Sequence, residues 1–300
     1  MYLEEQLISF IWWNTSLSFG KKRNLEDESR KVIFDTINKF TSSDVDCIVL
    51  TEISEEDVKE IRVECNLRGY KIRSIFDKVG KTHFDFCVIY KNATLEILGQ
   101  PIKIDKIVNN KSYKLGVRVK FFEKNSKEIF HTIFSHWPAR IYGTDIQKRN
   151  EMSARLRFSI ESDIIEKYRA DELGEPFIIL LGDYNEEPFS VHLSENLKST
   201  RDKFLVKKKP DLFYNPFWGD LSLKENQQHI GSYYFKKGDI TRWYTLDQIM
   251  YSHAFVDGKE WEVVDFLDRI MAFPELFSLI TDNESKLDHF PILGIIRKVN

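Results

Sequence analysis

The sequence has few of the features that mark secreted or membrane-spanning proteins. Only three of its 300 residues are cysteine, and the odd number and wide spacing of Cys47, Cys65 and Cys87 support neither a disulfide framework nor a cysteine-based metal site. No apolar run approaches the length of about 18 residues that a membrane-spanning helix needs. The first ten residues lack the basic segment of a secretory signal. We therefore expect reduced, buried thiols in a cytoplasmic protein with no membrane span.

An excess of charge of one sign is also missing. Lys and Arg total 44 and Asp and Glu total 47, for a net charge of −3, which excludes a generally basic coat for nucleic acid but not a local basic groove. Linkers rich in Pro, Gly or Ser and fixed-period repeats are absent. By contrast, the chain is 42% hydrophobic and contains 23 Phe, 12 Tyr and 6 Trp, enough for a large core. We expect a single domain over residues 1–300.

Short apolar runs alternate with helical patterns along the chain. Most of the runs are rich in β-branched or aromatic residues, and they lie at 8–13, 47–50, 86–90, 131–135, 177–181 and 290–296. Because they are almost continuously apolar, they predict strands that are buried on both faces. Residues 30–40, 55–67 and 145–168 repeat apolar side chains at helical spacing. This interleaving predicts an α/β fold with strands packed in a layered core and helices outside.

Polar side chains suited to catalysis lie at the ends of these predicted strands. They are Asn14, Glu52, His136, Asp183, Asn185, Asp288 and His289. Taken singly, each has an ordinary structural explanation, such as a turn residue or an acid at a helix N-terminus. Taken together, side chains at strand ends can converge on one rim of a sheet, which is a usual place for a ligand site.

The order of these residues resembles that of the endonuclease/exonuclease/phosphatase superfamily, whose fold is like that of deoxyribonuclease I. The resemblance rests on Trp13-Asn14, Ile48-Val49-Leu50-Thr51-Glu52, Ser135-His136-Trp137-Pro138-Ala139-Arg140, Leu181-Gly182-Asp183-Tyr184-Asn185-Glu186-Glu187-Pro188-Phe189, Thr245-Leu246-Asp247-Gln248-Ile249 and Leu287-Asp288-His289-Phe290-Pro291. It extends over residues 8–296. It implies a four-layer α/β sandwich, in which two packed mixed β-sheets are flanked by helices. Thr51, Leu287 and Gln248 depart from the residues usual at their positions and leave the subfamily open.

The resemblance also implies a metal site and a set of catalytic residues. Glu52, helped by Asn14 and joined by Asp288, is expected to hold Mg²⁺ or Mn²⁺, because these ions prefer hard oxygen ligands. Asp247 is expected to orient His289, which would take a proton from water. Asp183 is the alternative base, and the choice between the two stays open.

The remaining residues are expected to act on the phosphate. Asn185 would hydrogen-bond the scissile phosphate or hold the nucleophile, and His136 would stabilise the charged transition state or protonate the leaving group. The guanidinium of Arg140 suits a phosphate, although a surface ion pair is an equal alternative. For Arg149 a surface ion pair is the favoured interpretation.

These residues together predict a divalent-metal-dependent phosphohydrolase that cleaves phosphodiester bonds, with DNA or RNA as the expected substrate. A near-neutral chain gives no overall electrostatic preference for a polyanion. The alternative is therefore a phosphatase or phosphodiesterase for a nucleotide, an inositol phosphate or a phospholipid headgroup. A third hypothesis, a non-catalytic member that binds nucleic acid or protein, is disfavoured because the acidic, amide and imidazole residues are all present.

Overall fold

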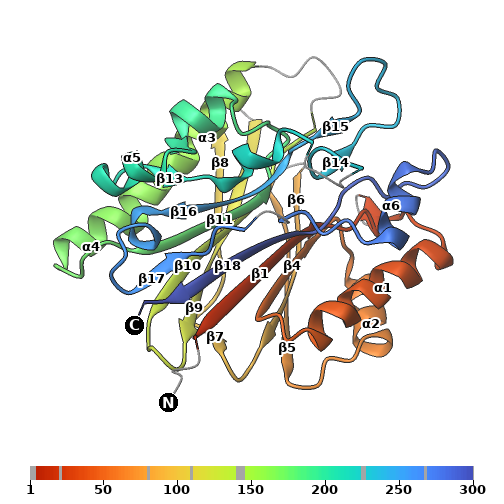
Figure 1. Ribbon diagram of the computed structural model, residues 1–300, viewed down its shortest axis with the longest axis horizontal. Helices are drawn as coiled ribbons and strands as arrows, with labels where there is room; N and C mark the ends of the chain where they lie inside the picture. Colours follow the sequence, from red (N-terminus) through yellow and green to blue (C-terminus); the bar gives the residue numbers. More distant parts are fainter. Residues whose placement is uncertain are drawn as a thin grey trace.

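The computed structural model describes residues 5–19, 22–79, 82–108, 111–139, 146–223, 228–266 and 269–299. Over these ranges the chain forms two mixed β-sheets that pack face to face, with helices on their outer faces (Figure 1). This arrangement confirms the predicted four-layer α/β sandwich.

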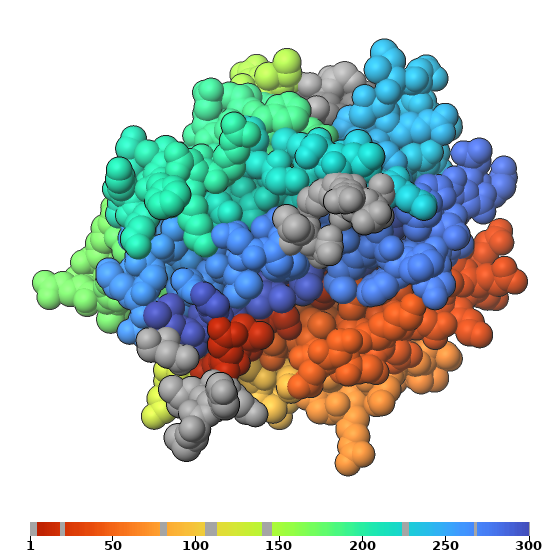
Figure 2. Space-filling view, viewed as in Figure 1, coloured from red at the N-terminus to blue at the C-terminus, as the bar shows by residue number. Residues whose placement is uncertain are grey.

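The first sheet combines strands from early and late in the sequence. Its strands are β1 (Leu7–Asn14), β4 (Cys47–Thr51), β5 (Tyr70–Val79), β6 (Thr82–Lys91), β17 (Trp261–Val263) and β18 (Ile292–Lys298). Their order is β17-β18-β1-β4-β6-β5. At the centre, β1 pairs in parallel with β4 and antiparallel with β18. In Figure 2 the red and dark-blue residues of these early and late strands accordingly lie side by side.

The second sheet is built from the middle of the chain. Its strands are β7 (Leu95–Ile97), β8 (Ile102–Val108), β9 (Lys111–Glu123), β10 (Ile129–His136), β11 (Phe177–Asp183), β12 (Ser199–Thr200), β13 (Phe213–Tyr214) and β16 (Asp247–Ser252). Their order is β12-β13-β16-β11-β10-β9-β7, and β8 also pairs with β9. Here β10 and β11 are parallel, whereas β11 and β16 are antiparallel. Two short hairpins pair β2 (Ser18–Phe19) with β3 (Lys22–Arg23) and β14 (Tyr233–Tyr234) with β15 (Trp243–Tyr244).

Helices cover both outer faces. On the side of the first sheet lie α1 (Asp27–Ser42) and α2 (Glu55–Glu64), with α6 (Pro274–Thr281) beside α1 (Figure 1). On the side of the second sheet lie α3 (Ile146–Ile160), the π-helical segment η1 (Glu161–Ile165) and α4 (Glu166–Ala170). The shorter helices are α5 (Lys203–Lys208), η2 (His192–Asn196), η3 (Pro216–Asp220) and η4 (His253–Phe255).

The central strands are buried on both faces, as their apolar sequences predict. In β10, Phe134 packs into the core between the sheets, whereas its neighbour Ile133 packs under α3. In β11, Leu181 likewise packs into the core between the sheets, and Leu180 packs under α3. This alternation lets one apolar run contribute to two layers of the core.

The predicted helix over 145–168 forms as three segments. Position 145 lies outside the described residues, and the five-residue π-helical η1 separates α3 from α4. The expected apolar ridge is nevertheless present, since Met152, Leu156, Ile160 and Ile164 all pack into the core under the second sheet. Among the described helices none has the length and apolar character to cross a membrane. All three cysteines are buried and unpaired.

Candidate active site

The pairing of the strands brings the predicted residues to one edge of the molecule. Asn14 ends β1 and lies in register with Thr51, which ends β4 and precedes Glu52. His136 ends β10 in register with Asp183 at the end of β11. Parallel strands end at the same edge of a sheet, which is why these segments meet. Asp247 opens the antiparallel β16 directly opposite Asp183.

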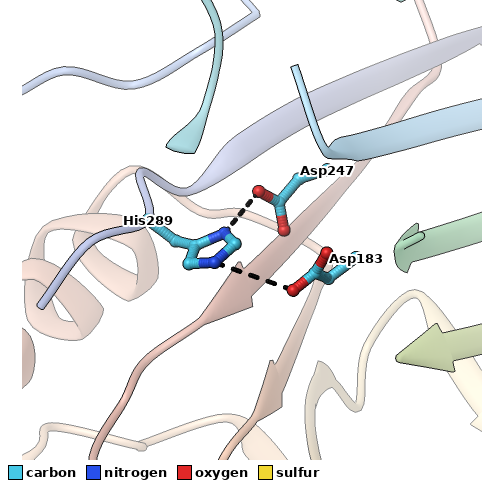
Figure 3. Close-up of side chains that lie close together, drawn as sticks. All are labelled: Asp183, Asp247 and His289. Carbon is cyan, nitrogen blue, oxygen red and sulfur yellow. Dashed lines mark hydrogen bonds and ion pairs between the residues drawn. The ribbon is translucent and has the colours of Figure 1, made fainter. Parts of the chain in front are cut away.

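Asp247 and His289 form a buried pair at the centre of this edge. Nδ1 of His289 lies 2.7 Å from Oδ2 of Asp247 (Figure 3). The carboxylate also accepts hydrogen bonds from Nε1 of Trp12 at 2.9 Å and from the hydroxyl of Ser232 at 2.7 Å. Burial alone lowers the pKa of His289, but the charges of Asp247 and Asp183 raise it well above its ordinary value. The pair therefore favours the imidazolium form.

Asp183 lies between the two candidate histidines. Its Oδ2 is 3.7 Å from Nε2 of His289 and 3.9 Å from Nε2 of His136. It accepts hydrogen bonds from Nδ2 of Asn14 at 3.2 Å and from the backbone N–H of Asn185 at 3.0 Å. Burial and the nearby Asp247 raise the pKa of Asp183. The charge of His289 opposes this rise, so the protonation states of Asp183 and His289 depend on each other.

Glu52 and Asn185 both adopt the left-handed backbone conformation, with φ of 54° and 51°. A non-glycine residue with positive φ is uncommon, and one such as Glu52 is held there only by the surrounding structure. Asn185 is fixed by donating from Nδ2 to the carbonyl oxygen of Trp137 at 2.9 Å. The constrained backbone therefore fixes the direction of both side chains.

Two acidic side chains at this edge, Glu52 and Asp288, have raised pKa values. Burial, and then the charge of Asp288, raise the pKa of Glu52 to about 8. Burial likewise raises the pKa of Asp288, to which the hydroxyl of Ser16 donates a hydrogen bond at 3.2 Å. Oxygen donors that repel one another in a partly buried site fit a divalent cation, which would relieve this repulsion.

A second donor set lies beside them. Asp183, Asp247 and His289 are buried, and their ligand atoms all lie within 4.8 Å of one another. Such a group is consistent with a metal site. In this structure, however, Asp247 already accepts hydrogen bonds from Trp12, Ser232 and His289.

His136 is held on the other side of Asp183. Its Nδ1 lies 3.2 Å from the hydroxyl of Thr51, and its Nε2 lies 3.6 Å from Oε1 of Glu52. Burial and the charge of Lys114 lower the pKa of His136 to about 3. At neutral pH this imidazole is therefore uncharged and acts through hydrogen bonds.

Two arginines were singled out from the sequence. Arg140 lies outside the described residues. Arg149 forms an ion pair with Glu186, as expected, but the expected surface location is wrong, because both side chains are buried.

The sequence analysis missed several partners of the catalytic side chains. Trp12 and Ser232 hold Asp247, and Thr51 contacts His136. The ring of Tyr233 packs 4.7 Å from that of His289. Only weak signals existed. Trp12 precedes the motif Trp13-Asn14, Thr51 is a departure within the motif that ends in Glu52, and Tyr233 is followed by two further aromatic residues.

Comparisons with known proteins agree with this geometry. The sequence matches the family described as "Endonuclease/Exonuclease/phosphatase family" over residues 20–293. A search of curated proteins gave no significant match. Among solved structures, the human Nocturnin catalytic domain is 13% identical, with 98% of each chain covered and a TM-score of 0.58.

Two further solved structures are similar over almost their whole lengths. ANGEL2, described as a 2′,3′-cyclic phosphatase, is 13% identical, with 100% of this chain and 98% of ANGEL2 covered and a TM-score of 0.65. A mannosyl-6-phosphatase from Bacteroides thetaiotaomicron VPI-5482 is 14% identical, with 98% and 100% covered and a TM-score of 0.58. At these identities the likeness concerns the fold.

Proposed function

The chain belongs to the endonuclease/exonuclease/phosphatase family, and we propose that it is a divalent-metal-dependent phosphohydrolase that cleaves phosphodiester bonds in DNA or RNA. The observation that carries the proposal is the convergence at one edge of two imidazoles, the carboxylates of Asp183 and Asp247, and a separate pair of oxygen donors, Glu52 and Asp288. Hydrolysis of a phosphodiester needs its negative charge neutralised, a water activated and the leaving oxygen stabilised.

In this proposal, Glu52, Asn14 and Asp288 would hold Mg²⁺ or Mn²⁺. A bound cation supplies charge neutralisation at a phosphate oxygen. Ionised carboxylates are needed for this, so the raised pKa of Glu52 makes cation binding compete with protons.

The proton of the attacking water passes to the ionised carboxylate of Asp183, or to Nε2 of His289 when that nitrogen carries no proton, and the choice between these two bases stays open. The water oxygen bonds to phosphorus while the bond from phosphorus to the leaving oxygen breaks. Asp247 fixes the ring of His289 and stabilises its charged form. Neutral His136 and the amide of Asn185 donate hydrogen bonds to the phosphate oxygens or the leaving oxygen.

A nucleic acid is the proposed substrate because of the β14–β15 hairpin. The base of the hairpin contacts the site through Tyr233, whose ring packs on His289. Its connecting segment carries Lys236, Lys237 and Arg242 against the single acid Asp239. This positive segment projects from the surface of the molecule, in light blue (Figure 2). A strand of phosphates leaving the site along the hairpin would be attracted to it.

A small phosphoester is the second candidate, and a pocket favours it. A cavity of about 200 Å³ is lined by Ile53, which follows Glu52 in the sequence, by the start of α2 and by Phe76, His83 and Asp85. Glu55 and Glu56 also border it. Their charges repel further phosphates, whereas an uncharged organic group attached to one phosphate fits.

One panel of assays tests the activity and separates the two substrates. Turnover of bis-p-nitrophenyl phosphate with Mg²⁺ or Mn²⁺, abolished by EDTA, is expected from the wild type. Plasmid DNA, single-stranded DNA, RNA and small phosphoesters are then compared at several salt concentrations. Cleavage restricted to monoesters would overturn the nuclease proposal. Absence of any metal-dependent turnover, with no effect of His289→Ala, would favour a binding protein.

A paired variant tests the hairpin. Reversing charge with Lys237→Glu and Arg242→Glu is expected to raise KM for single-stranded DNA or RNA and to reduce its salt dependence, while leaving KM for bis-p-nitrophenyl phosphate unchanged. The matched control, Lys207→Glu with Lys208→Glu in α5, is distant from the hairpin (Figure 1). Equal effects of the two pairs on polymer cleavage would contradict a role for the hairpin.

A further inference from the structure

Arg149, near the start of α3, is almost fully buried, with 4% of its surface exposed. Its Nη1 donates to Oε1 of Glu186 at 2.8 Å, and its Nη2 donates to the carbonyl oxygen of Pro138 at 2.6 Å. Nη1 also lies 3.4 Å from the carbonyl oxygen of Asn185 and 3.5 Å from that of Tyr184. One guanidinium therefore contacts acceptors on two separate segments of chain.

These two segments carry candidate catalytic residues. Pro138 lies two residues after His136, which ends β10, and Asn185 lies two residues after Asp183, which ends β11. The segments are joined directly by the bond from Trp137 N–H to the carbonyl oxygen of Asp183, at 2.8 Å. Nδ2 of Asn185 also donates to the carbonyl oxygen of Trp137 at 2.9 Å, and the guanidinium adds a further connection.

The network continues to a third catalytic strand through Glu186, which is fully buried. The backbone carbonyl oxygen of Glu186 accepts a hydrogen bond from Nε2 of Gln248 at 2.7 Å. Gln248 follows Asp247 at the start of β16. The Arg149–Glu186 pair is thus in contact with the ends of β10, β11 and β16.

The position of this ion pair is unfavourable for stability alone. A positive charge near the start of a helix opposes the helix dipole. A buried ion pair loses solvation, and apolar side chains of similar volume often stabilise a protein equally well. A planar guanidinium, in contrast, fixes the directions of several acceptors at once. The contacts to backbone carbonyls are therefore the distinctive property of Arg149.

We propose that Arg149, held by Glu186, is a positioning residue that sets the segments after β10 and β11 so that His136 and Asn185 face the phosphate. The inference rests on the proposed hydrolysis. Arg149 itself does not contact the reacting atoms in this assignment, and it acts through the two segments.

Arg149→Lys tests the proposal because it keeps the charge and removes the planar fork. With bis-p-nitrophenyl phosphate and Mg²⁺, kcat is expected to fall about 10- to 100-fold with KM changed less than about 2-fold, since misplaced catalytic groups slow the chemical step. Glu186→Gln is the second variant and is expected to act in the same direction. An unchanged kcat in folded samples of both would overturn the inference.

Arg157→Lys provides a matched control on the same helix. Arg157 is also buried, pairs with Glu161 at 2.7 Å and lies over the ring of Phe213. None of these partners belongs to the segments after β10 and β11. Its kcat is expected to stay within about 2-fold of wild type. Equal losses of kcat in Arg149→Lys and Arg157→Lys would show that Arg149 contributes only to the packing of the helix, and would overturn the proposal.

Hydrogen exchange gives a readout that does not depend on activity. The backbone N–H groups of Trp137 and Tyr184 donate to Asp183 and Leu246, so their exchange reports the order of these segments. Faster exchange over residues 136–139 and 183–187 is expected in Arg149→Lys but not in Arg157→Lys. Unchanged exchange would overturn the positioning role even if the wild type proves inactive, whereas an inactive wild type with faster exchange would overturn only the proposed function.

Discussion

Asp247 has the most completely determined surroundings of the candidate catalytic side chains. It is fully buried, and its two oxygens receive hydrogen bonds from Trp12, Ser232 and His289. A buried carboxylate with this many donors is held in one position and fixes the orientation of the imidazole. The charge of His289 consequently depends on the buried carboxylate of Asp247.

Replacing Asp247 with asparagine tests this dependence. The neutral amide would lack the negative charge that stabilises the imidazolium of His289, so we expect kcat for bis-p-nitrophenyl phosphate to fall by about 10²- to 10⁴-fold. Steady-state kinetics of Asp247→Asn, His289→Ala and the double variant provide the measurement. Because the two residues act as a unit, the double variant should lose little more than either single one. If the double variant shows the product of the two single losses in kcat, the two residues act independently and the pairing is contradicted.

Glu52→Gln tests whether the surroundings of Glu52, at the proposed metal site, disfavour its charged form. Glu52 has a folded pKa of about 8, above its ordinary value, so folding favours the protonated form. As pH rises from about 5 to about 8, the cation-free wild type should lose stability relative to Glu52→Gln, by about 1–3 kcal/mol in total. Urea unfolding in EDTA at several pH values measures this difference. A difference that does not change with pH would be inconsistent with the raised pKa.

At the scale of single residues, the sequence located the candidate site residues better than the side chains that contact them. Asn14, Glu52, His136 and Asp183 were recognisable because a polar residue directly follows an apolar strand. The contact of Ser232 with Asp247 could not be predicted, since it requires knowing that the β14–β15 hairpin folds back over β16. A serine in a loop carries no local signal of its partner.

At the scale of elements, the parallel pairing of β10 with β11 places His136 beside Asp183. The approach of the two strands is close at Gly182, where a Cβ atom would meet the carbonyl oxygen of Ser135 at 2.5 Å. Glycine is required there by space rather than by backbone conformation.

Gly182→Ala should therefore separate the ends of these strands. We expect a loss of about 1–3 kcal/mol in unfolding free energy and a fall in kcat larger than this loss alone would cause, because Asp183 is displaced from His136. Thermal unfolding and kinetics at a temperature where the variant is folded provide the test. Gly219→Ala, where the nearest atom lies 3.9 Å away, is the control and should behave as wild type. Normal kcat in folded Gly182→Ala would contradict the argument.

The elements themselves were largely predictable. Apolar runs and helical spacing located β1, β4, β6, β10, β11, β18 and the helices α1, α2 and α3. The π-helical η1 was not predicted, because Ile160 and Ile164 keep the ordinary helical spacing across its start. Hydrogen-bond shifts within a helix depend on packing against the sheet rather than on side-chain pattern.

At the scale of the whole molecule, the two mixed sheets were implied by the resemblance and not by the apolar pattern. The strand order depends on contacts far apart in sequence, such as β1 with β18, and short-range periodicity contains no information on them. The second donor set likewise draws on both sheets, because Asp183 and Asp247 lie in the second sheet and His289 lies just before β18 of the first. The other set, Asn14, Glu52 and Asp288, lies at or near the ends of strands of the first sheet.

Binding of a cation at Asn14, Glu52 and Asp288 should stabilise the whole fold, because these residues come from segments far apart in the sequence. Anything that binds only the folded state adds stability by mass action, about 2.7 kcal/mol at a concentration 100-fold above Kd. Addition of Mg²⁺ or Mn²⁺ is thus expected to raise the Tm of the wild type by several degrees, and to raise that of Glu52→Gln much less. Differential scanning calorimetry with EDTA as reference measures both. Equal increases in the Tm of the wild type and of Glu52→Gln would indicate that the cation binds elsewhere.

The central position of β1 beside β18 has a consequence for biosynthesis. While the ribosome is still translating the middle of the message, β1 lacks its antiparallel neighbour and the imidazole of His289 has not been made. A nascent polypeptide therefore lacks one of the two imidazoles of the candidate site and the strand that pairs with β1. The candidate active site can therefore be completed only after translation has passed His289 and β18.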